Sequence, residues 1–308
     1  MPVDADVLDH RVRLRAFDFL DEQSAVHGEV LPWSVLNRGF DIDGRRVPLL
    51  GPQGIFKPAL LPEVPLSIAT APVVEDRPRP YEDGIDQHGL LIYRYRGSDP
   101  QHRDNVGLRL AMQRQIPLIY LFGVTKGQYM AEYPVYIVGD DPSDLSFRVA
   151  FDDRRAARVD EVLPDRMAEA RRSYVTALTL RRLHQQTFRQ RVLRAYQERC
   201  SICRLKHVEL LDAAHILPDN HPRGEPVVPN GLALCKLHHA AFDGHLLGIR
   251  HDLVVEVRPD ILLESDGPML LHGLQEAANV RILVPRAEVL RPNQGFLEER
   301  YALFKKAG

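Results

Sequence analysis

Apolar residues recur at helical spacing near both ends of the chain, whereas the middle of the chain shows short apolar runs of the kind that form strands. Leu8, Val12, Ala16 and Leu20 follow one another at four-residue intervals, which predicts a helix over 5–27 that Gly28 ends. The same reasoning predicts further helices at 32–37, 105–115, 170–199 and 294–305.

Between residues 66 and 151 the pattern is mostly that of strands. Short strands with one or two helices among them favour a small curved sheet, and therefore an α+β domain. The strands expected there are 66–69, 90–95, 118–124, 133–140 and 147–151. Beyond Asp243, a hairpin is expected from 246–250 and 253–257, with a last strand at 281–284.

The length of 308 residues suggests two domains. Residues 152–170 are highly charged and contain Pro164, which is typical of a connection. We therefore expect an N-terminal domain at 1–153, a linker with a basic helix at 154–187, and a C-terminal domain at 188–308. The N-terminus lacks an apolar segment, and no apolar run reaches the length of a membrane span, so we expect the protein in the cytoplasm.

The net charge of −2 does not by itself indicate a nucleic-acid partner, but the charge is unevenly distributed. Residues 170–206 contain ten Lys and Arg against one acid. Such a run is either a solvated helix face or a surface for the phosphate backbone. For the second interpretation, Arg189, Arg191 and Arg194 are the candidate backbone contacts.

All three cysteines of the chain belong to one pattern. Cys200 and Cys203 form a C-x2-C pair, and Cys235 and His238 repeat that spacing about thirty residues later. Two such pairs supply the four ligands of a tetrahedral Zn²⁺ site. A site with four protein ligands is closed, so it predicts a structural role for the zinc. The alternative is three buried thiols and a surface histidine.

Around these ligands lie residues that the zinc does not use. His215 follows a short apolar run that is expected to be a strand, Asn230 opens the next segment, and His239 belongs to a short helix. The stretch resembles the HNH endonucleases, in the variant with Ala-Ala-His-Ile and Leu-Cys-x-x-His-His-x-x-Phe-Asp boxes. The resemblance implies a ββα-metal fold in which His215 is the general base, Asn230 orients it, and His239 binds a divalent cation at the scissile phosphate.

One position departs from that family. Many HNH enzymes carry a metal-binding aspartate directly before the base, where this chain has Ala214. Asp243, four residues after His239, is the first candidate for the missing ligand, and Asp212 is the second. Asp243 before Gly244 is equally well explained as turn chemistry. Oxygen ligands with one imidazole favour Mg²⁺ or Mn²⁺.

A second motif lies in the central region, where Tyr81 and Tyr95 flank an acid-rich turn that contains Asp83 and Asp86. The passage resembles SRA domains, PUA-like folds that flip 5-methylcytosine out of DNA. The resemblance implies that the two tyrosines stack on the flipped base and that a carboxylate reads its edge. Gly84 replaces one aspartate of the family pattern, so either Asp83 or Asp86 is the reader. The alternative is a β-turn with buried tyrosines.

Together these motifs predict a modification-dependent DNA endonuclease that acts on double-stranded DNA carrying modified cytosine. One HNH finger cuts one strand, so a double-strand break requires a homodimer or two nicks. Two other functions remain open. One is a zinc-containing DNA-binding module without catalysis, and the other is an HNH nuclease whose N-terminal domain reads another base or RNA.

Overall fold

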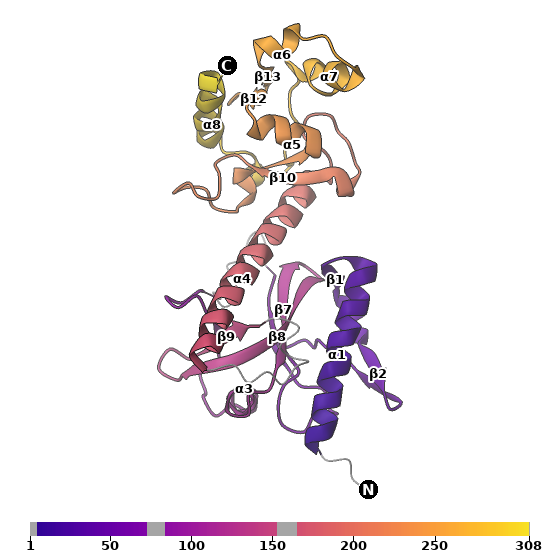
Figure 1. Ribbon diagram of the computed structural model, residues 1–308, viewed down its shortest axis with the longest axis vertical. Helices are drawn as coiled ribbons and strands as arrows, with labels where there is room; N and C mark the ends of the chain where they lie inside the picture. Colours follow the sequence, from indigo (N-terminus) through magenta and orange to yellow (C-terminus); the bar gives the residue numbers. More distant parts are fainter. Residues whose placement is uncertain (1–4, 73–83, 153–164, 308) are drawn as a thin grey trace. The chain divides into compact units, whose positions relative to one another are not determined.

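The computed structural model describes residues 5–72, 84–152 and 165–307 (Figure 1). The chain divides into two compact units, Met1–Leu183 and His184–Gly308, and the division lies within the segment 154–187 that was expected to connect two domains. The predicted α+β class is confirmed. Among the residues described, no helix combines the length and the apolarity that crossing a membrane requires.

Unit 1 is built on a seven-stranded sheet with the strand order β4-β5-β7-β8-β9-β6, and β1 also pairs with β8. Neighbouring strands are antiparallel except for β5 and β7, which are parallel. The strands are β1 Val30–Pro32, β4 Ile55–Phe56, β5 Ser67–Thr70, β6 Leu91–Arg94, β7 Leu118–Thr125, β8 Gln128–Asp141 and β9 Ser146–Phe151.

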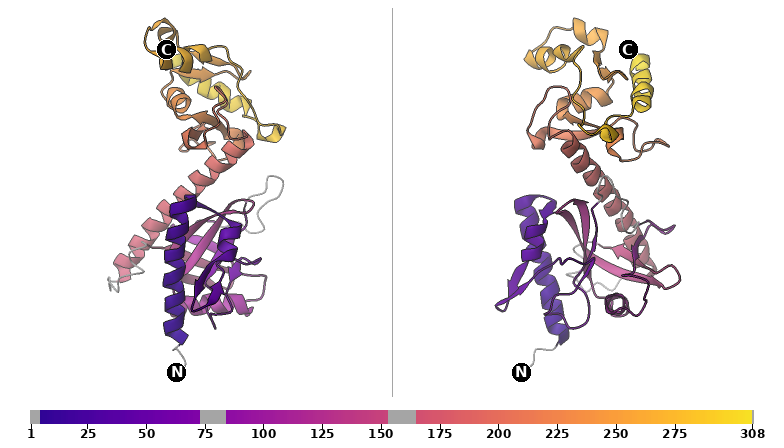
Figure 2. Two further views of the ribbon diagram at one scale, coloured as in Figure 1. Left: turned by 90° about the vertical axis from the view of Figure 1, so that its right-hand side faces the viewer. Right: turned by 180° about the vertical axis from the view of Figure 1, so that it is seen from behind.

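The sheet is curved and is covered on both faces. Register shifts interrupt the β7–β8 and β8–β9 pairs, and such bulges bend a sheet. Along β7, Tyr120 and Phe122 join a core with α3 (Arg103–Gln113) and the first part of α4 (Asp165–Ala195). Ile119 and Leu121 join the core on the other side, which α1 (Ala5–His27) covers (Figure 2). Alternation with period two therefore places the two cores on opposite faces.

The elements predicted for unit 1 are confirmed, with small differences in their bounds. The strand expected at 133–140 is longer, because β8 begins at Gln128 and its first three residues pair with β1. The shortest elements were not predicted from the sequence, because two or three residues are too few to show a periodic pattern of apolar positions. These are β1, β4 and the hairpin of β2 (Phe40–Ile42) and β3 (Arg45–Val47); the helix expected at 32–37 is α2 (Trp33–Arg38).

Unit 2 contains the hairpin of β10 and β11 followed by α5, a ββα arrangement. The last turns of α4 pack against this hairpin through Phe188 and Val192, and Tyr196 directly after the helix joins them in the unit's core. The remaining elements are η1 Val208–Leu210, β10 Leu211–His215, η2 Val228–Asn230, β11 Gly231–Cys235, α5 Lys236–Asp243, β12 Leu247–Ile249, β13 Val255–Val257, α6 Pro259–Leu263, α7 Pro268–Gly273, η3 Gln275–Ala277, η4 Glu288–Leu290 and α8 Gln294–Ala307.

The predicted hairpin after Asp243 is confirmed as β12 and β13. The strand expected at 281–284 is wrong in extent, because the structure has only a single bridge between Val254 and Arg281 there. That apolar run packs through Ile282 without the backbone pairing of a strand.

Candidate active site and metal centres

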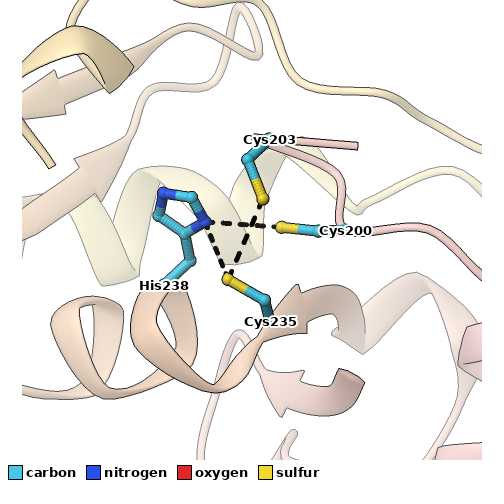
Figure 3. Close-up of side chains that lie close together, drawn as sticks. All are labelled: Cys200, Cys203, Cys235 and His238. Carbon is cyan, nitrogen blue, oxygen red and sulfur yellow. Dashed lines mark hydrogen bonds between the residues drawn. The ribbon is translucent and has the colours of Figure 1, made fainter. Parts of the chain in front are cut away.

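The four predicted zinc ligands converge in one cluster (Figure 3). Cys200 and Cys203 lie in the turn after α4, Cys235 ends β11, and His238 lies in the first turn of α5. Their ligand atoms all lie within 4.8 Å of one another. The Nδ1 atom of His238 is 3.4 Å from Sγ of Cys200 and 3.2 Å from Sγ of Cys235.

These distances test whether zinc fits. Tetrahedral Zn–S bonds of about 2.3 Å place neighbouring ligand atoms about 3.8 Å apart. The Sγ atoms of Cys203 and Cys235 are 3.9 Å apart, and the two contacts to His238 are slightly shorter. The Cys3His donor set and its closed geometry fit a structural Zn²⁺. Four protein ligands leave no open position for substrate, which is the geometry of a structural site.

His215 lies at the end of β10, opposite Gly231 of β11. Its imidazole stacks on the ring of Phe188, with the ring centroids 4.1 Å apart and the planes 20° apart. Gly231 permits this approach, since a Cβ there would lie 2.5 Å from Val192 and 2.9 Å from Phe188. Phe188 was not among the site residues predicted from the sequence, and its contact with His215 is a structural finding.

The surroundings of His215 suit a base. Burial is the main cause that lowers the pKa of His215 below its ordinary value. The charge of His239 also lowers this pKa, whereas the charges of Asp219 and Asp243 raise it. The imidazole is therefore neutral at pH 7 and can accept a proton. Its Nε2 is buried and has no hydrogen-bond partner in the described part of the chain.

Asn230 is fully buried, and the structure gives it partners in the loop that follows His215. Its side chain accepts from the backbone N–H of Leu217 at 2.9 Å and donates to the carbonyls of Leu217 at 3.0 Å and Glu225 at 3.1 Å. Its own carbonyl accepts from the N–H of Ile216 at 2.9 Å. Asn230 thus fixes the backbone directly after His215. The orientation of the imidazole by Asn230 stays a prediction.

His239 lies between two carboxylates. Its Nδ1 is 3.4 Å from Asp212 and its Nε2 is 3.2 Å from Asp243. Hydrogen bonds with Asp212 and then Asp243 raise the pKa of His239 to about 9, and contact with His239 lowers the pKa of each carboxyl. Each of these carboxylates also lies near an arginine: Arg189 is 3.6 Å from Asp212, and Arg300 is 3.5 Å from Asp243.

The donors around His239 fit a divalent cation, with one restriction. Carboxylate oxygens and an imidazole suit Mg²⁺ or Mn²⁺. However, Asp212 and Asp243 contact opposite nitrogens of one ring, so the three donors do not converge on one point. A cation at either nitrogen leaves the other carboxylate to orient the ring. Both candidate ligands therefore lie at His239, and Asp212 is on the same strand face as Ala214.

The three arginines proposed for the DNA backbone differ in their surroundings. Arg189 donates to the carbonyls of Val208 at 3.0 Å and Leu211 at 2.8 Å. Arg191 is partly buried, and Arg194 is exposed. Arg194 is thus the most accessible of the three to a partner.

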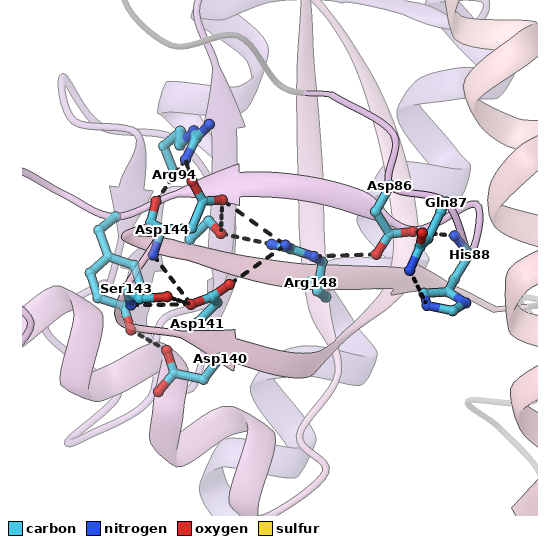
Figure 4. Close-up of polar contacts among 11 residues, drawn as sticks. Asp86, Gln87, His88, Arg94, Asp140, Asp141, Ser143, Asp144 and Arg148 are labelled. Atoms are coloured by element: carbon cyan, nitrogen blue, oxygen red, sulfur yellow. Dashed lines mark hydrogen bonds and ion pairs between the residues drawn. The ribbon is translucent and has the colours of Figure 1, made fainter.

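Of the four residues predicted to bind the modified base, Tyr81 and Asp83 lie outside the described residues. Asp86 accepts from the N–H groups of His88 and Leu90 at 2.8 and 3.0 Å, and its other oxygen is 3.2 Å from Arg148 (Figure 4). These contacts stabilise the turn that precedes β6.

Tyr95 is buried beside β6. Its ring lies 4.6 Å from that of Phe147, and its hydroxyl hydrogen-bonds with Asp140 and accepts from Arg109 at 3.2 Å. Burial raises the pKa of Tyr95. One part of Tyr95 lines a cavity of about 390 Å³ in unit 1, which is bounded by 50–55, 69–72, 93–96 and Tyr129.

Comparison with known proteins agrees with the site in unit 2. Residues 200–250 match the sequence model of the HNH endonuclease family. Unit 2 therefore contains an HNH endonuclease domain. No curated protein matches the chain.

Two solved structures show distant similarity. One is the modification-dependent TagI restriction endonuclease, with a TM-score of 0.28 and 18% identity over 78% of this chain and 82% of that chain. The other is the type IV phosphorothioation-dependent restriction endonuclease ScoMcrA, with a TM-score of 0.21 and 17% identity over 57% of this chain and 52% of that chain.

Proposed function

We propose that the protein is a modification-dependent DNA endonuclease, in which unit 1 reads a modified cytosine in double-stranded DNA and unit 2 hydrolyses a nearby phosphodiester bond. The observation that carries the proposal is the separation of roles in unit 2. Four side chains form a closed Cys3His cluster, whereas His215 and His239 lie outside it, with His239 between the carboxylates of Asp212 and Asp243.

In the reaction, neutral His215 takes a proton from the attacking water. Phe188 holds the imidazole plane, and Asn230 holds the backbone that follows it. His239 and Asp243 would hold a Mg²⁺ or Mn²⁺ ion, with Asp212 on the other nitrogen of His239. Such an ion supplies charge stabilisation to the scissile phosphate and the leaving oxygen.

The reading site is proposed for unit 1. Its cavity of about 390 Å³ lies within the range of about 300–1,000 Å³ for small-ligand pockets, so a base turned out of the duplex fits by size. Tyr93 borders it with a hydroxyl that donates to the carbonyl of Ala69 at 3.2 Å. Tyr81 and Asp83 precede β6, the strand that contains Tyr93, by about ten residues in the sequence.

The test uses the full-length protein with Mg²⁺ or Mn²⁺ and four plasmids or duplexes of one sequence: unmodified, 5-methylcytosine, 5-hydroxymethylcytosine and phosphorothioate DNA. We expect cleavage of DNA with modified cytosine and little of unmodified DNA. Tyr81→Ala should reduce this discrimination while non-specific nicking survives. Full discrimination by Tyr81→Ala would remove the flipping pocket from the proposal.

Ala214 favours one second candidate, a zinc-containing DNA-binding module without catalysis, because it stands where many HNH enzymes have a metal ligand. Binding of modified DNA without cleavage under any divalent metal would support that candidate.

A further inference from the structure

Arg189 has an unusual position for a residue in a basic run. It lies on α4 at the level of the η1–β10 corner, and one of its terminal nitrogens donates to two backbone carbonyls there. Its Nε is 3.6 Å from an oxygen of Asp212, the second residue of β10. The guanidinium therefore contacts both the backbone and the side chain at the start of this strand.

The second oxygen of Asp212 is the one that lies 3.4 Å from Nδ1 of His239. Asp212 is thus held from one side by Arg189 and contacts the proposed cation ligand from the other side. An aspartate with 42% of its side chain exposed has several accessible rotamers unless a partner selects one of them. The backbone N–H of Ala213 donates to the Oδ1 of Asp212 at 2.9 Å, and Arg189, with 25% exposed, is the cationic side chain that pairs with the same oxygen.

We propose that Arg189 is a positioning residue of the cleavage centre. It fixes the carboxylate of Asp212 against Nδ1 of His239, and so sets the orientation of the imidazole for the divalent cation. The inference rests on the proposed function of unit 2. It assigns Arg189 a role within the protein, in contrast to a contact with the DNA backbone.

The fork geometry of the guanidinium explains why this position needs arginine. Two carbonyls and a carboxylate lie around one side chain, and arginine offers five donors in a plane. A lysine offers a point charge at a single position and reproduces only part of this set. Arg194, which is exposed on the same helix, provides the matched comparison for a phosphate contact.

The first measurement is Mn²⁺ binding to the full-length protein without DNA, by calorimetry or electron paramagnetic resonance. Partners that orient a metal-binding histidine contribute about 10- to 100-fold in metal affinity. We expect Arg189→Gln and Asp212→Asn each to weaken Mn²⁺ binding by at least about 10-fold. The Mn²⁺ affinity of Arg189→Lys should lie between those of the wild-type protein and Arg189→Gln. The double variant should bind Mn²⁺ no more weakly than Asp212→Asn, because Arg189 acts through Asp212.

Additive losses in the double variant would overturn the proposal, since they would mean that Arg189 does not act through Asp212. Unchanged Mn²⁺ affinity in Arg189→Gln would overturn it as well. Zinc content and thermal unfolding are measured for each variant. If Arg189→Gln fails to fold, Arg189→Lys, alone and combined with Asp212→Asn, decides in the same way.

The second measurement separates positioning from phosphate contact. Binding of a modified duplex is followed by fluorescence anisotropy without added Mg²⁺ or Mn²⁺, and without a chelator that would remove the structural zinc, at several salt concentrations. Loss of one phosphate contact reduces the slope of log K against log salt by about one. We expect Arg194→Gln to show this reduction and Arg189→Gln to keep the wild-type slope. A reduced slope with wild-type Mn²⁺ affinity in Arg189→Gln would assign it to the backbone instead.

Different results would contradict the proposed function of unit 2 and the role of Arg189. If the wild-type protein binds Mn²⁺ at His239 but cuts no DNA, the proposed function fails, whereas the coupling of Arg189 to Asp212 is still measured by Mn²⁺ binding. If DNA is cut normally and Arg189→Gln changes neither Mn²⁺ affinity nor the metal concentration at half-maximal cutting, only the role of Arg189 fails.

Discussion

The ring of Phe188 stacks on the imidazole of His215, with 4.1 Å between the ring centroids and 20° between the planes. Phe188 comes from α4 and His215 from the end of β10, so a helix side chain fixes the proposed base from outside the ββα hairpin. The contact also keeps water from one face of the imidazole, which agrees with the lowered pKa of His215.

Phe188→Leu should change the pH dependence of cutting. His215 is active when neutral, so cleavage falls as the pH drops through its pKa, which burial holds below the ordinary value of 6.5. A smaller, non-planar side chain admits water, so the pKa returns toward 6.5 and the acid limb moves to higher pH. Single-turnover cleavage rates from pH 5 to 8.5 locate the acid limb of the pH profile. At pH 8 the cleavage rate of Phe188→Leu should be roughly 10-fold below that of the wild type, because the imidazole loses its orientation.

Leu193→Ala is the control for Phe188→Leu, because Leu193 is buried on the same helix in the same core. It should lower the thermal stability without moving the acid limb. An unchanged limb in Phe188→Leu would mean that the stack does not set the pKa of His215.

His215→Ala should abolish cutting while DNA binding and zinc content stay at wild-type levels. General-base catalysis contributes about 10²- to 10⁴-fold, and the zinc cluster does not include His215. Cleavage is followed with supercoiled modified plasmid and binding by anisotropy. Cutting at more than about a tenth of the wild-type rate would assign the base to another residue.

Cys203→Ala should prevent unit 2 from folding. Structural zinc contributes about 10–16 kcal/mol of apparent binding free energy in zinc-finger peptides, which exceeds the stability of most domains. Zinc per chain should fall from one to near zero, and the thermal transition of unit 2 should disappear. Cys203→His, which still offers a ligand, serves as the control. A Cys203→Ala protein that melts like wild type without metal would contradict a structural zinc.

Asn230→Ala should loosen the loop after His215. The substitution leaves the N–H of Leu217 and the carbonyls of Leu217 and Glu225 without their partner, at about 1–3 kcal/mol for each buried group left unsatisfied. Hydrogen exchange should increase over 216–225, and cutting should slow because this backbone holds the base. Asn230→Asp keeps an acceptor for Leu217 and should lose less stability; equal exchange in all three proteins would argue against this role.

Ala69→Leu tests the cavity of unit 1. Ala69 lines the cavity, and the added carbons would occupy space that a flipped base needs. We expect at least about a 10-fold loss of preference for modified over unmodified duplex, equivalent to about 1.4 kcal/mol. Non-specific nicking in Mn²⁺ by unit 2 should not change, which provides the internal control. A preference equal to that of wild type would place the reading site elsewhere.

The sequence by itself determined the zinc ligands and the identity of the HNH segment, because those depend on residue type and spacing within about forty residues. Two C-x2-C-like pairs and a ββα pattern leave few arrangements for Cys200, Cys235 and His238. The longer helices and strands were also predictable, since eight or more residues of one period give a clear signal.

The tertiary structure decided what no local pattern contains. It brought Phe188 to His215, Arg189 to Asp212 and Arg300 to Asp243, across separations of 27, 23 and 57 residues. Each of these residues looks in the sequence like an ordinary member of an amphipathic or charged helix. Its partner is set by how α4 and α8 pack against the hairpin and α5, and packing between distant segments is not encoded in spacing.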